Sequence, residues 1–464
     1  MKYECDTWDV SFCHTRSQCD KTKRPRCHKR ESIMLYDNLS INDKGHLTIG
    51  GLDACELAAE YGTPLYVLDE DVIRRNCRTY VEAMHECFGP DAAPLYASKA
   101  LCFKGIYPVV ESEGMCVDVV SPGEIYTAAA AGFPPEKMFF HGTNKTDSDI
   151  RFALGQGVGY FVVDNHNELA ALDRIAGEMG VNQKVLLRLT LGLDPHTLEA
   201  INTGRVDSQF GVPIDTGQAD GFVRAALSCS NITVEGFHSH VGSQIFESDS
   251  FMRQVEIFAE YSARIQREMG FTAGVINVGG GFGVRYTEKD PVIDIPARIR
   301  EVSEHLKSAC AKYGIDVPNV YMEPGRSIVA DAGVTLYETG GVKEVAGYRN
   351  YVTVDGGMTD NPRYALYKSE YTVLNASRAD QDADYEVTVA GRCCESGDRI
   401  AEYVSIAKPE RGDIIAVLTT GAYNYAMASN YNRVPRPAMV MISGGESRLV
   451  IRRETYADMM KNEL

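Results

Sequence analysis

The chain has 464 residues, of which 44% are hydrophobic and 24% charged, a composition typical of a globular protein with two or three domains. The formal net charge of −17 argues against a nucleic-acid partner and against binding to an anionic membrane surface. No apolar stretch approaches the roughly 20 residues that a membrane-spanning helix needs. Because the start of the chain lacks a signal-peptide core and the 13 cysteines are scattered, we expect reduced thiols and a cytoplasmic location.

Residues 1–33 differ in composition from the rest of the chain. They contain Cys5, Cys13, Cys19 and Cys27, but the spacing matches no tight CxxC or HxxxH zinc pattern. We interpret this segment as a disordered N-terminal extension. The first globular pattern is a strand-like segment, and we assign residues 34–71 to a unit that contributes to a β domain.

Short apolar runs alternate with helical stretches between residues 95 and 325. Eight such runs predict eight strands, at 95–98, 116–120, 138–141, 160–163, 185–189, 234–238, 275–278 and 320–323. Near-continuous apolar strands that alternate with helices indicate an α/β fold, a (β/α)8 TIM-like barrel, which we place at residues 72–328. Longer spacing after the fifth and seventh runs predicts one or two inserted elements there.

The pattern changes after residue 325. Strand-like runs at 328–336, 351–355, 385–390, 414–418 and 438–442 have few helical windows between them. They predict a separate antiparallel β-sandwich or β-barrel domain over residues 329–464.

Polar residues collect where the predicted barrel strands end, which is the working face of such barrels. Lys99 is the most informative of them, because a lysine that is desolvated at a strand end loses part of its charge and becomes a nucleophile, as Schiff-base enzymes require. A solvated surface charge is the competing interpretation for any lysine. The other residues at this face are His141, Asp164, His238, His240, Gly279, Gly280, Gly281, Glu323 and Arg326.

The three consecutive glycines after the seventh strand let backbone amides approach an anion, in the position where barrels bind phosphate. Together with Lys99 they favour a phosphorylated cofactor that forms a Schiff base, which pyridoxal phosphate satisfies. Glu323 would suit the pyridine nitrogen of that cofactor, although an ion pair with Arg326 is an alternative. His238 and His240 have the spacing of metal ligands, but we expect no metal and consider one packed and one stacked histidine as the alternative.

In this order along more than 300 residues, the motifs identify the chain as similar to the diaminopimelate decarboxylases, fold-type III pyridoxal-phosphate enzymes with an alanine-racemase-like barrel and a β domain. The matching strings are YASKA (96–100), DVVSPGE (118–124), HSHVGSQ (238–244), NVGGG (277–281), EPGR (323–326), CESGD (394–398), GAY (421–423) and MASNYN (427–432). The sequence departs from the usual pattern at Thr143, Gln209 and residues 363–367, which leaves the shape of the loops open.

The resemblance implies a role for each candidate residue. Lys99 would form the Schiff base, and Cys394 or Lys99 would return the proton to the substrate after CO2 leaves. The cofactor-binding residues would be Lys99, His240, Ser243, Gly279, Gly280, Gly281, Glu323 and Tyr423. The substrate-binding residues would be Arg326, Arg363, Tyr367, Glu395 and Tyr423. An ordinary thiol at Cys394 and a surface charge at Arg363 are the interpretations that the residues alone would favour.

The resemblance also implies a homodimer with shared active sites, because Cys394 and Glu395 reach the site from the partner subunit in this family. The implied reaction is decarboxylation of meso-2,6-diaminopimelate to L-lysine, the last step of lysine biosynthesis. The alternatives are a decarboxylase of the same fold that acts on ornithine, arginine, lysine or carboxynorspermidine, a non-catalytic pyridoxal-phosphate-binding regulatory protein, and a metal-dependent hydrolase. Arg363 and Glu395 argue against simple diamine precursors, since a substrate without a distal carboxylate would leave Arg363 unpaired.

Overall fold

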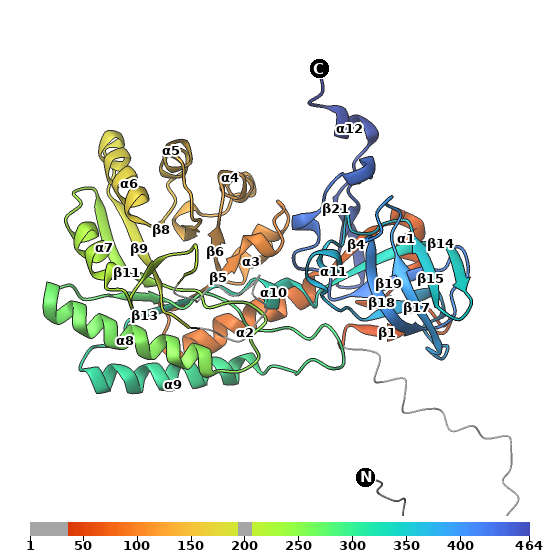
Figure 1. Ribbon diagram of the computed structural model, residues 1–464, viewed down its shortest axis with the longest axis horizontal. Coiled ribbons are helices and arrows are strands. Elements are labelled where there is room, and N and C mark those ends of the chain that lie inside the picture. Colours follow the sequence, from red (N-terminus) through yellow and green to blue (C-terminus); the bar gives the residue numbers. More distant parts are fainter. Residues whose placement is uncertain (1–35, 194–206) are drawn as a thin grey trace, which may run out of the picture.

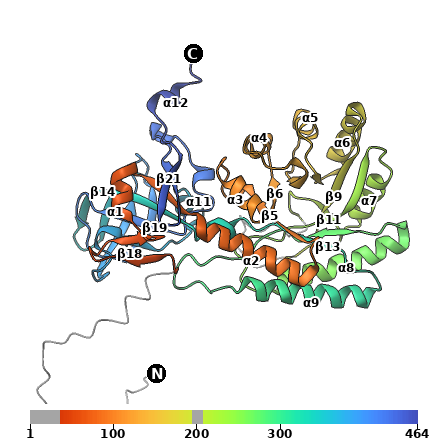
Figure 2. The same ribbon diagram turned by 180° about the vertical axis from the view of Figure 1, so that it is seen from behind.

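The computed structural model describes residues 36–193 and 207–464, so the extension expected at residues 1–33 lies outside the described residues. A barrel of strands and helices lies beside a β domain, and the C-terminal helix α12 (Tyr456–Met460) projects beyond the β domain (Figure 1, and from behind in Figure 2). In the described part of the chain, no helix is both long enough and apolar enough to cross a membrane.

The barrel has the eight parallel strands that the sequence predicts. Its circle is closed, because β13 pairs with β5 and β8 pairs with β9. One inserted element follows the fifth barrel strand, β10 (Val212–Pro213). The strands of the circle are β5 (Ala93–Ala97), β6 (Cys116–Val119), β7 (Met138–Phe140), β8 (Tyr160–Val163), β9 (Gln183–Thr190), β11 (Ile232–His238), β12 (Val275–Asn277) and β13 (Asn319–Met322).

The barrel helices begin and end where the sequence provides caps. In α4, the Ser121 hydroxyl accepts the amide of Glu124 and Pro122 occupies the first turn, while Gly132 takes a left-handed φ of 79° beyond the end. The outer helices are α2 (Glu70–Phe88), α3 (Ile106–Ser112), α4 (Pro122–Ala130), α5 (Asp147–Gln156), α6 (His166–Met179), α7 (Gln218–Leu227), α8 (Asp249–Met269) and α9 (Ile295–Tyr313).

The β domain is mostly antiparallel, as predicted, and contains two parallel pairings, β15 with β17 and β4 with β20. The short helices α1 (Ala54–Tyr61), α10 (Arg326–Val329) and α11 (Arg363–Tyr367) lie at its edges or at its junction with the barrel. Its strands are β4 (Leu65–Asp69), β14 (Gly333–Val345), β15 (Arg349–Val354), β16 (Val373–Asn375), β17 (Tyr385–Ala390), β18 (Arg399–Ile406), β19 (Ile414–Leu418), β20 (Ala438–Ser443) and β21 (Glu446–Ile451).

The predicted strand at 328–336 is wrong in its first half. Ile328 and Val329 belong to helix α10, and the strand β14 begins only at Gly333. Both side chains are fully buried, so their apolar character reflects burial at the junction rather than a strand.

The segment before the barrel lies with the β domain. Its first part forms a three-stranded antiparallel sheet of β1 (Leu39–Ile41), β2 (Leu47–Ile49) and β3 (Leu52–Asp53). Strand β4 is buried along its whole length and lies between β14 and β20. The chain then passes directly into α2 and the barrel.

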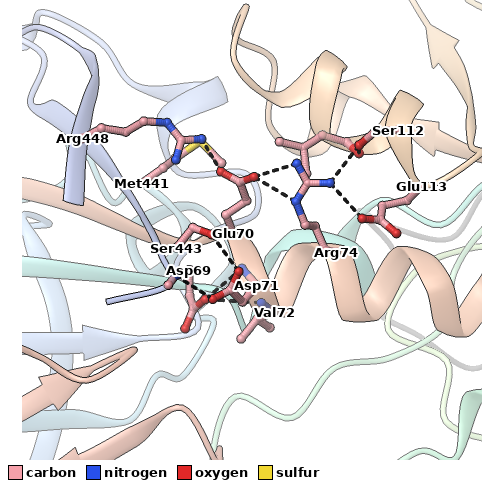
Figure 3. Close-up of polar contacts among 12 residues, drawn as sticks. Asp69, Glu70, Asp71, Val72, Arg74, Ser112, Glu113, Met441, Ser443 and Arg448 are labelled. Atoms are coloured by element: carbon pink, nitrogen blue, oxygen red, sulfur yellow. Dashed lines mark hydrogen bonds and ion pairs between the residues drawn. The ribbon is translucent and has the colours of Figure 1, made fainter. Parts of the chain in front are cut away.

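A network of ion pairs joins the two domains around the start of α2 (Figure 3). The buried Glu70 pairs with Arg448 of β21 on one side and with Arg74 of α2 on the other, at 2.7 Å. Arg74 in turn pairs with Glu113, beyond the end of α3, at 2.8 Å. These contacts link β21 of the β domain, the start of α2 and the end of α3.

Candidate active site

A cavity of about 430 Å³ lies at the carboxyl ends of the barrel strands and is covered by segments of the β domain. The expected residues that line it are Lys99, His240, Ser243, Glu323, Arg326, Arg363, Tyr367 and Tyr423. Segments that follow the five barrel strands β5, β6, β7, β11 and β13 meet α11 and the loop at 421–427 around this space. Thr143 and Gln209, where the sequence departs from the family pattern, also line this cavity.

Lys99 lies in the short helix η1 (Ser98–Ala100), directly after β5. Its amine is 3.5 Å from Oδ2 of Asp118, which is completely buried, while the lysine side chain is 42% exposed toward the cavity. Burial opposes the charge on Lys99, but Asp118, with Tyr423 and Glu323, raises the pKa of the amine above its ordinary value. The expectation that desolvation deprives this lysine of part of its charge is therefore wrong for the ligand-free protein, because the neighbouring carboxylates outweigh burial.

The three glycines after β12 form a loop that only glycine can build. Gly279 has φ of 69°, and a Cβ there would lie 2.8 Å from Nδ1 of His240. A Cβ on Gly280 would lie 2.1 Å from the carbonyl oxygen of Glu323, and one on Gly281 would lie 2.4 Å from that of Gly242. These close approaches exceed what a plain turn requires.

A small cavity of about 40 Å³ opens beside this loop, lined by Gly280 and Gly281 together with Lys99, Ser243 and Arg326. Arg326 is buried and donates to the Ser243 hydroxyl at 2.9 Å. A guanidinium, a hydroxyl and glycine backbone at one small space suit an oxyanion such as phosphate.

Glu323 follows β13 and is surrounded by donors. Its Oε1 accepts the Asn277 amide at 2.7 Å, and its Oε2 lies 3.2 Å from Nε2 of His238. Nε2 of His141 lies 3.0 Å from Oε1, without the alignment of a hydrogen bond. Burial opposes ionisation, but His141 and His238 hold the pKa of Glu323 well below its usual range. The carboxyl is therefore an anion inside the cavity.

His240 has a different partner from His238, although the two side chains are separated by one residue. Nδ1 of His240 accepts the backbone amide of Gly280 at 3.2 Å, so the ring is tied to the glycine loop. Burial and Lys99 lower the pKa of His240 well below its ordinary value, and the ring is neutral. The two histidines are thus not assembled as a pair of metal ligands. Among the described residues, His141, His238 and Glu323 are close enough to hold a metal, but the Asn277 amide already donates to that carboxylate.

Two arginines flank one tyrosine among the residues that line the cavity. The guanidinium carbons of Arg326 and Arg363 lie 4.8 Å and 5.5 Å from the ring centre of Tyr423. Arg363 is only 8% exposed, donates to Ser369 at 3.3 Å, and has an Nε without a hydrogen-bond partner. Its guanidinium also lies 5.5 Å from the ring of Tyr367. A buried cation with spare donors at a cavity wall is suited to an anionic group of a ligand.

Cys394 and Glu395 are exposed and do not line the cavity of their own chain. The loop that carries them is nevertheless ordered by Asp398, which is buried. One carboxylate oxygen of Asp398 accepts the amide of Cys393 at 2.7 Å, and the other accepts that of Met358 at 2.7 Å. Asp398 therefore fixes this loop against the segment that leads to α11 and Arg363.

Sequence reasoning missed several residues of the site. Asp118 pairs with Lys99, Asn277 fixes both Glu323 and the amide of Gly279, and Tyr286 accepts a hydrogen bond from Arg326 at 2.7 Å. His141 was noted at its strand end but received no role. The signal that could have found Asp118 is a carboxylate inside an apolar strand, which is rare without a partner.

Comparisons with known proteins agree with this geometry. Residues 70–330 match the family described as "Pyridoxal-dependent decarboxylase, pyridoxal binding domain". The chain is 44% identical to the diaminopimelate decarboxylase of Bacillus subtilis (strain 168), over 93% of this chain and 98% of that protein. It is 40% identical to the diaminopimelate decarboxylase of Staphylococcus aureus (strain COL), over 91% of this chain and 98% of that protein.

A solved structure is similar along nearly its whole length. The crystal structure of diaminopimelate decarboxylase from M. jannaschii in complex with L-lysine superposes with a TM-score of 0.84 at 33% identity, and the match covers 92% of this chain and 98% of that chain.

Proposed function

The chain belongs to the diaminopimelate decarboxylases, and from this we propose how its own residues hold cofactor and substrate and carry out the reaction. The reaction is the decarboxylation of meso-2,6-diaminopimelate to L-lysine and CO2, the last step of lysine biosynthesis, and it depends on pyridoxal phosphate. The observation that carries the assignment of residues is the convergence of Lys99, Glu323 and Arg363 on one cavity, while Lys99 and Glu323 also line the smaller cavity beside the glycine loop.

The residues present fit pyridoxal phosphate. A Cβ on Gly280 or Gly281 would collide with a backbone carbonyl oxygen, so only glycine lets the loop take this form, and Arg326 and Ser243 supply donors at the small cavity beside it. When bound, the cofactor supplies an aldehyde that condenses with amines and a pyridine ring that accepts the electron pair released by decarboxylation. We assign the phosphate to Gly279, Gly280, Gly281 and Ser243.

The remaining cofactor contacts follow from the electrostatics of the cavity. The ionised Glu323 would hold a proton on the pyridine nitrogen, because an anion within hydrogen-bond distance favours the protonated ring. His240, neutral and tied to Gly280, would lie against the face of the ring. Lys99, which Asp118 orients at 3.5 Å, would provide the amine that anchors the cofactor and exchanges with the substrate amine. Tyr423 would lie beside the ring.

We assign the distal carboxylate of the substrate to Arg363, with Arg326 and Tyr367. The support is the buried Arg363 guanidinium, whose Nε has no hydrogen-bond partner among the described residues. A planar guanidinium binds both oxygens of a carboxylate, which orients the substrate as well as holding it. A substrate with only one carboxylate would leave this cation unpaired, which argues against ornithine, arginine and lysine as substrates.

We propose a homodimer in which Cys394 and Glu395 of each chain complete the site of the partner subunit. Their exposure, together with the ordering of their loop by Asp398, supports this arrangement. Glu395 would bind the distal amine of the substrate. Cys394 or Lys99 would return a proton to Cα after CO2 has left.

We also propose a cytoplasmic location, supported by the free thiols of the described cysteines. The domain boundaries that we propose are residues 34–71 and 329–464 for the β domain and 72–328 for the barrel, with residues 1–33 as an extension. Deletion of residues 1–33 should leave activity intact, and a large loss would give the extension a structural role.

The deciding experiment is a substrate screen for released CO2 with added pyridoxal phosphate. Release from meso-diaminopimelate that depends on the cofactor is expected. Release from ornithine or carboxynorspermidine but not from meso-diaminopimelate would transfer the assignment to a related decarboxylase, and no release from any of them would favour a regulatory protein.

A further inference from the structure

We propose that His141 and His238 act as a pair of positioning residues that keep Glu323 ionised and directed at the pyridine nitrogen. The inference rests on the proposed function, in which Glu323 faces that nitrogen. It adds a task for two residues whose polar partners in the described structure are Glu323 and Asp118.

The two histidines approach Glu323 from different sides of the barrel. His141 follows β7 and His238 ends β11, whereas Glu323 follows β13, and none of these three strands is a neighbour of another in the sheet. Their Nε2 atoms lie 3.0 Å and 3.2 Å from the two different oxygens of Glu323. The imidazole rings themselves meet edge to face, with centres 4.9 Å apart. Each carboxylate oxygen is thus faced by one histidine nitrogen.

The positions of the protons follow from the contacts. Burial lowers the pKa of His238 to about 4, so its ring is neutral at physiological pH. Nδ1 of His238 has no hydrogen-bond partner, and a bare acceptor there costs less than a buried unpaired donor, so the proton belongs on Nε2, facing Glu323. His238 therefore donates, and Glu323 accepts as an anion.

His141 contacts the same carboxylate without the alignment of a hydrogen bond. Its Nε2 also lies 3.8 Å from Oδ1 of Asp118, a completely buried oxygen without a hydrogen-bond partner. The ring thus lies between the carboxylate that orients Lys99 and the carboxylate that would face the cofactor ring. Contacts of this kind are often poorly aligned in a ligand-free site and tighten when the ligand binds.

The pair matters because Glu323 is almost completely buried. A carboxylate in such surroundings takes up a proton unless several donors stabilise its charge. If both histidines lost their N–H groups, Asn277 would be the remaining side-chain donor to Glu323 among the described residues. Glu323 would then become neutral more easily and would no longer favour a protonated pyridine ring in the cofactor. A charge-assisted hydrogen bond contributes about 1.5–3 kcal/mol, which corresponds to roughly 10-fold to 150-fold in an equilibrium or a rate.

The test compares two substitutions of similar size at each histidine. Leu fills the space but has no N–H, whereas Gln keeps a donor near the position of Nε2. The variants are His141→Leu with His238→Leu, and His141→Gln with His238→Gln, each prepared as the holoenzyme. His85→Leu, on the exposed face of α2, is the control. The primary measurement is the 15N chemical shift of pyridoxal phosphate that carries 15N in its ring.

The wild-type ring is expected to be protonated, the double Leu variant unprotonated in most molecules, and the double Gln variant protonated again. The turnover number of the double Leu variant should fall by roughly 10-fold or more, with most of it recovered by Gln. A ring that stays protonated in the double Leu variant, or Leu and Gln variants that behave alike, would overturn the inference.

If the double Leu variant does not fold, the single Leu variants carry the test, and each must show a larger unprotonated fraction than its Gln counterpart. Equal fractions would overturn the inference. A wild-type ring that is itself unprotonated would instead overturn the role of Glu323 in the proposed function, and this inference with it.

Discussion

Replacement of Arg363 by Met tests how the cavity recognises the second carboxylate of its substrate. The Met side chain fills part of the space of the arginine with an unbranched apolar chain, but it removes the guanidinium and its contacts with the rings of Tyr367 and Tyr423. Among the described residues, the side-chain hydrogen bond that is lost is the 3.3 Å contact with Ser369, worth about 1 kcal/mol. We therefore expect a small shift of the denaturation midpoint and normal cofactor binding, because Arg363 does not line the small glycine-rich cavity.

The effect on the reaction should be far larger than the effect on stability. Arg363 is 8% exposed, so its removal takes a buried cation away from the substrate carboxylate and leaves Arg326 as the other guanidinium assigned to it. Removal of one partner from such a pair costs about 3–5 kcal/mol. At 1.36 kcal/mol for each tenfold, kcat/KM for meso-diaminopimelate should fall by roughly 150-fold to 5000-fold.

The assay is release of CO2 from meso-diaminopimelate and, in parallel, from lysine in either configuration, which lacks the distal carboxylate. The preference for the dicarboxylate should fall by the same factor as kcat/KM. Arg224→Met, at an exposed arginine of α7, is the matched control and should change neither value. A loss of less than tenfold with meso-diaminopimelate, or an equal loss with both substrates, would refute the assignment of Arg363.

Three further predictions concern the site shared between subunits, the loop that carries Cys394, and the buried carboxyl of Asp331. The Lys99→Ala protein should be nearly inactive and the Cys394→Ala protein should turn over slowly, but mixing them after reversible dissociation should raise CO2 release above that of either variant, because each hybrid dimer contains one intact site; no increase would contradict sites shared between subunits. Asp398→Ala removes the acceptor that orders the Cys394 loop and should lower kcat by about tenfold or more while the affinity for pyridoxal phosphate stays unchanged in a cofactor titration; unchanged kcat would contradict the ordering role. Burial raises the pKa of Asp331 to about 6, so the folded protein binds this proton more tightly than the unfolded chain, and the contribution of Asp331 to stability falls as the pH rises from about 4 to about 6. Asp331→Asn keeps the oxygen that accepts from Asn76 at 2.9 Å. The denaturation midpoint of the variant, relative to that of the wild type, should therefore rise as the pH increases across this range and stay constant above it. A difference between the two midpoints that does not depend on pH would contradict the pKa shift.

The barrel could be predicted because each of its strands carries a strong local signal. Apolar runs such as β8 and β9 are buried on both faces and need no knowledge of their neighbours to be recognised. The ends of parallel strands meet at one face, so Lys99 and Glu323 could be placed together from their positions after β5 and β13. Weaker strands were missed for the opposite reason. In β18, exposed and partly exposed positions interrupt the apolar ones, and its assignment depends on pairing with β17.

The contacts inside the site could be predicted only in part. His141 and Glu323 follow strands that are separated by β5 and β6 in the sheet, so their contact depends on the width and tilt of the closed barrel rather than on the order of its elements. The prediction that Lys99 loses part of its charge was wrong for a related reason. Burial can be expected for a residue at a strand end, but the distance to Asp118 decides the sign of the pKa shift, and that distance comes only from the folded structure.

The placement of β4 has a consequence for how the protein is made on the ribosome. The strand is synthesised before the barrel, yet its two sheet partners, β14 and β20, follow the barrel in the chain. While residues 70–330 emerge, β4 is a mostly apolar strand with both edges open, a form that favours aggregation. The β domain can close only after β20 has left the ribosome, so proteins truncated before residue 438 should accumulate in inclusion bodies even though their barrel segment is complete.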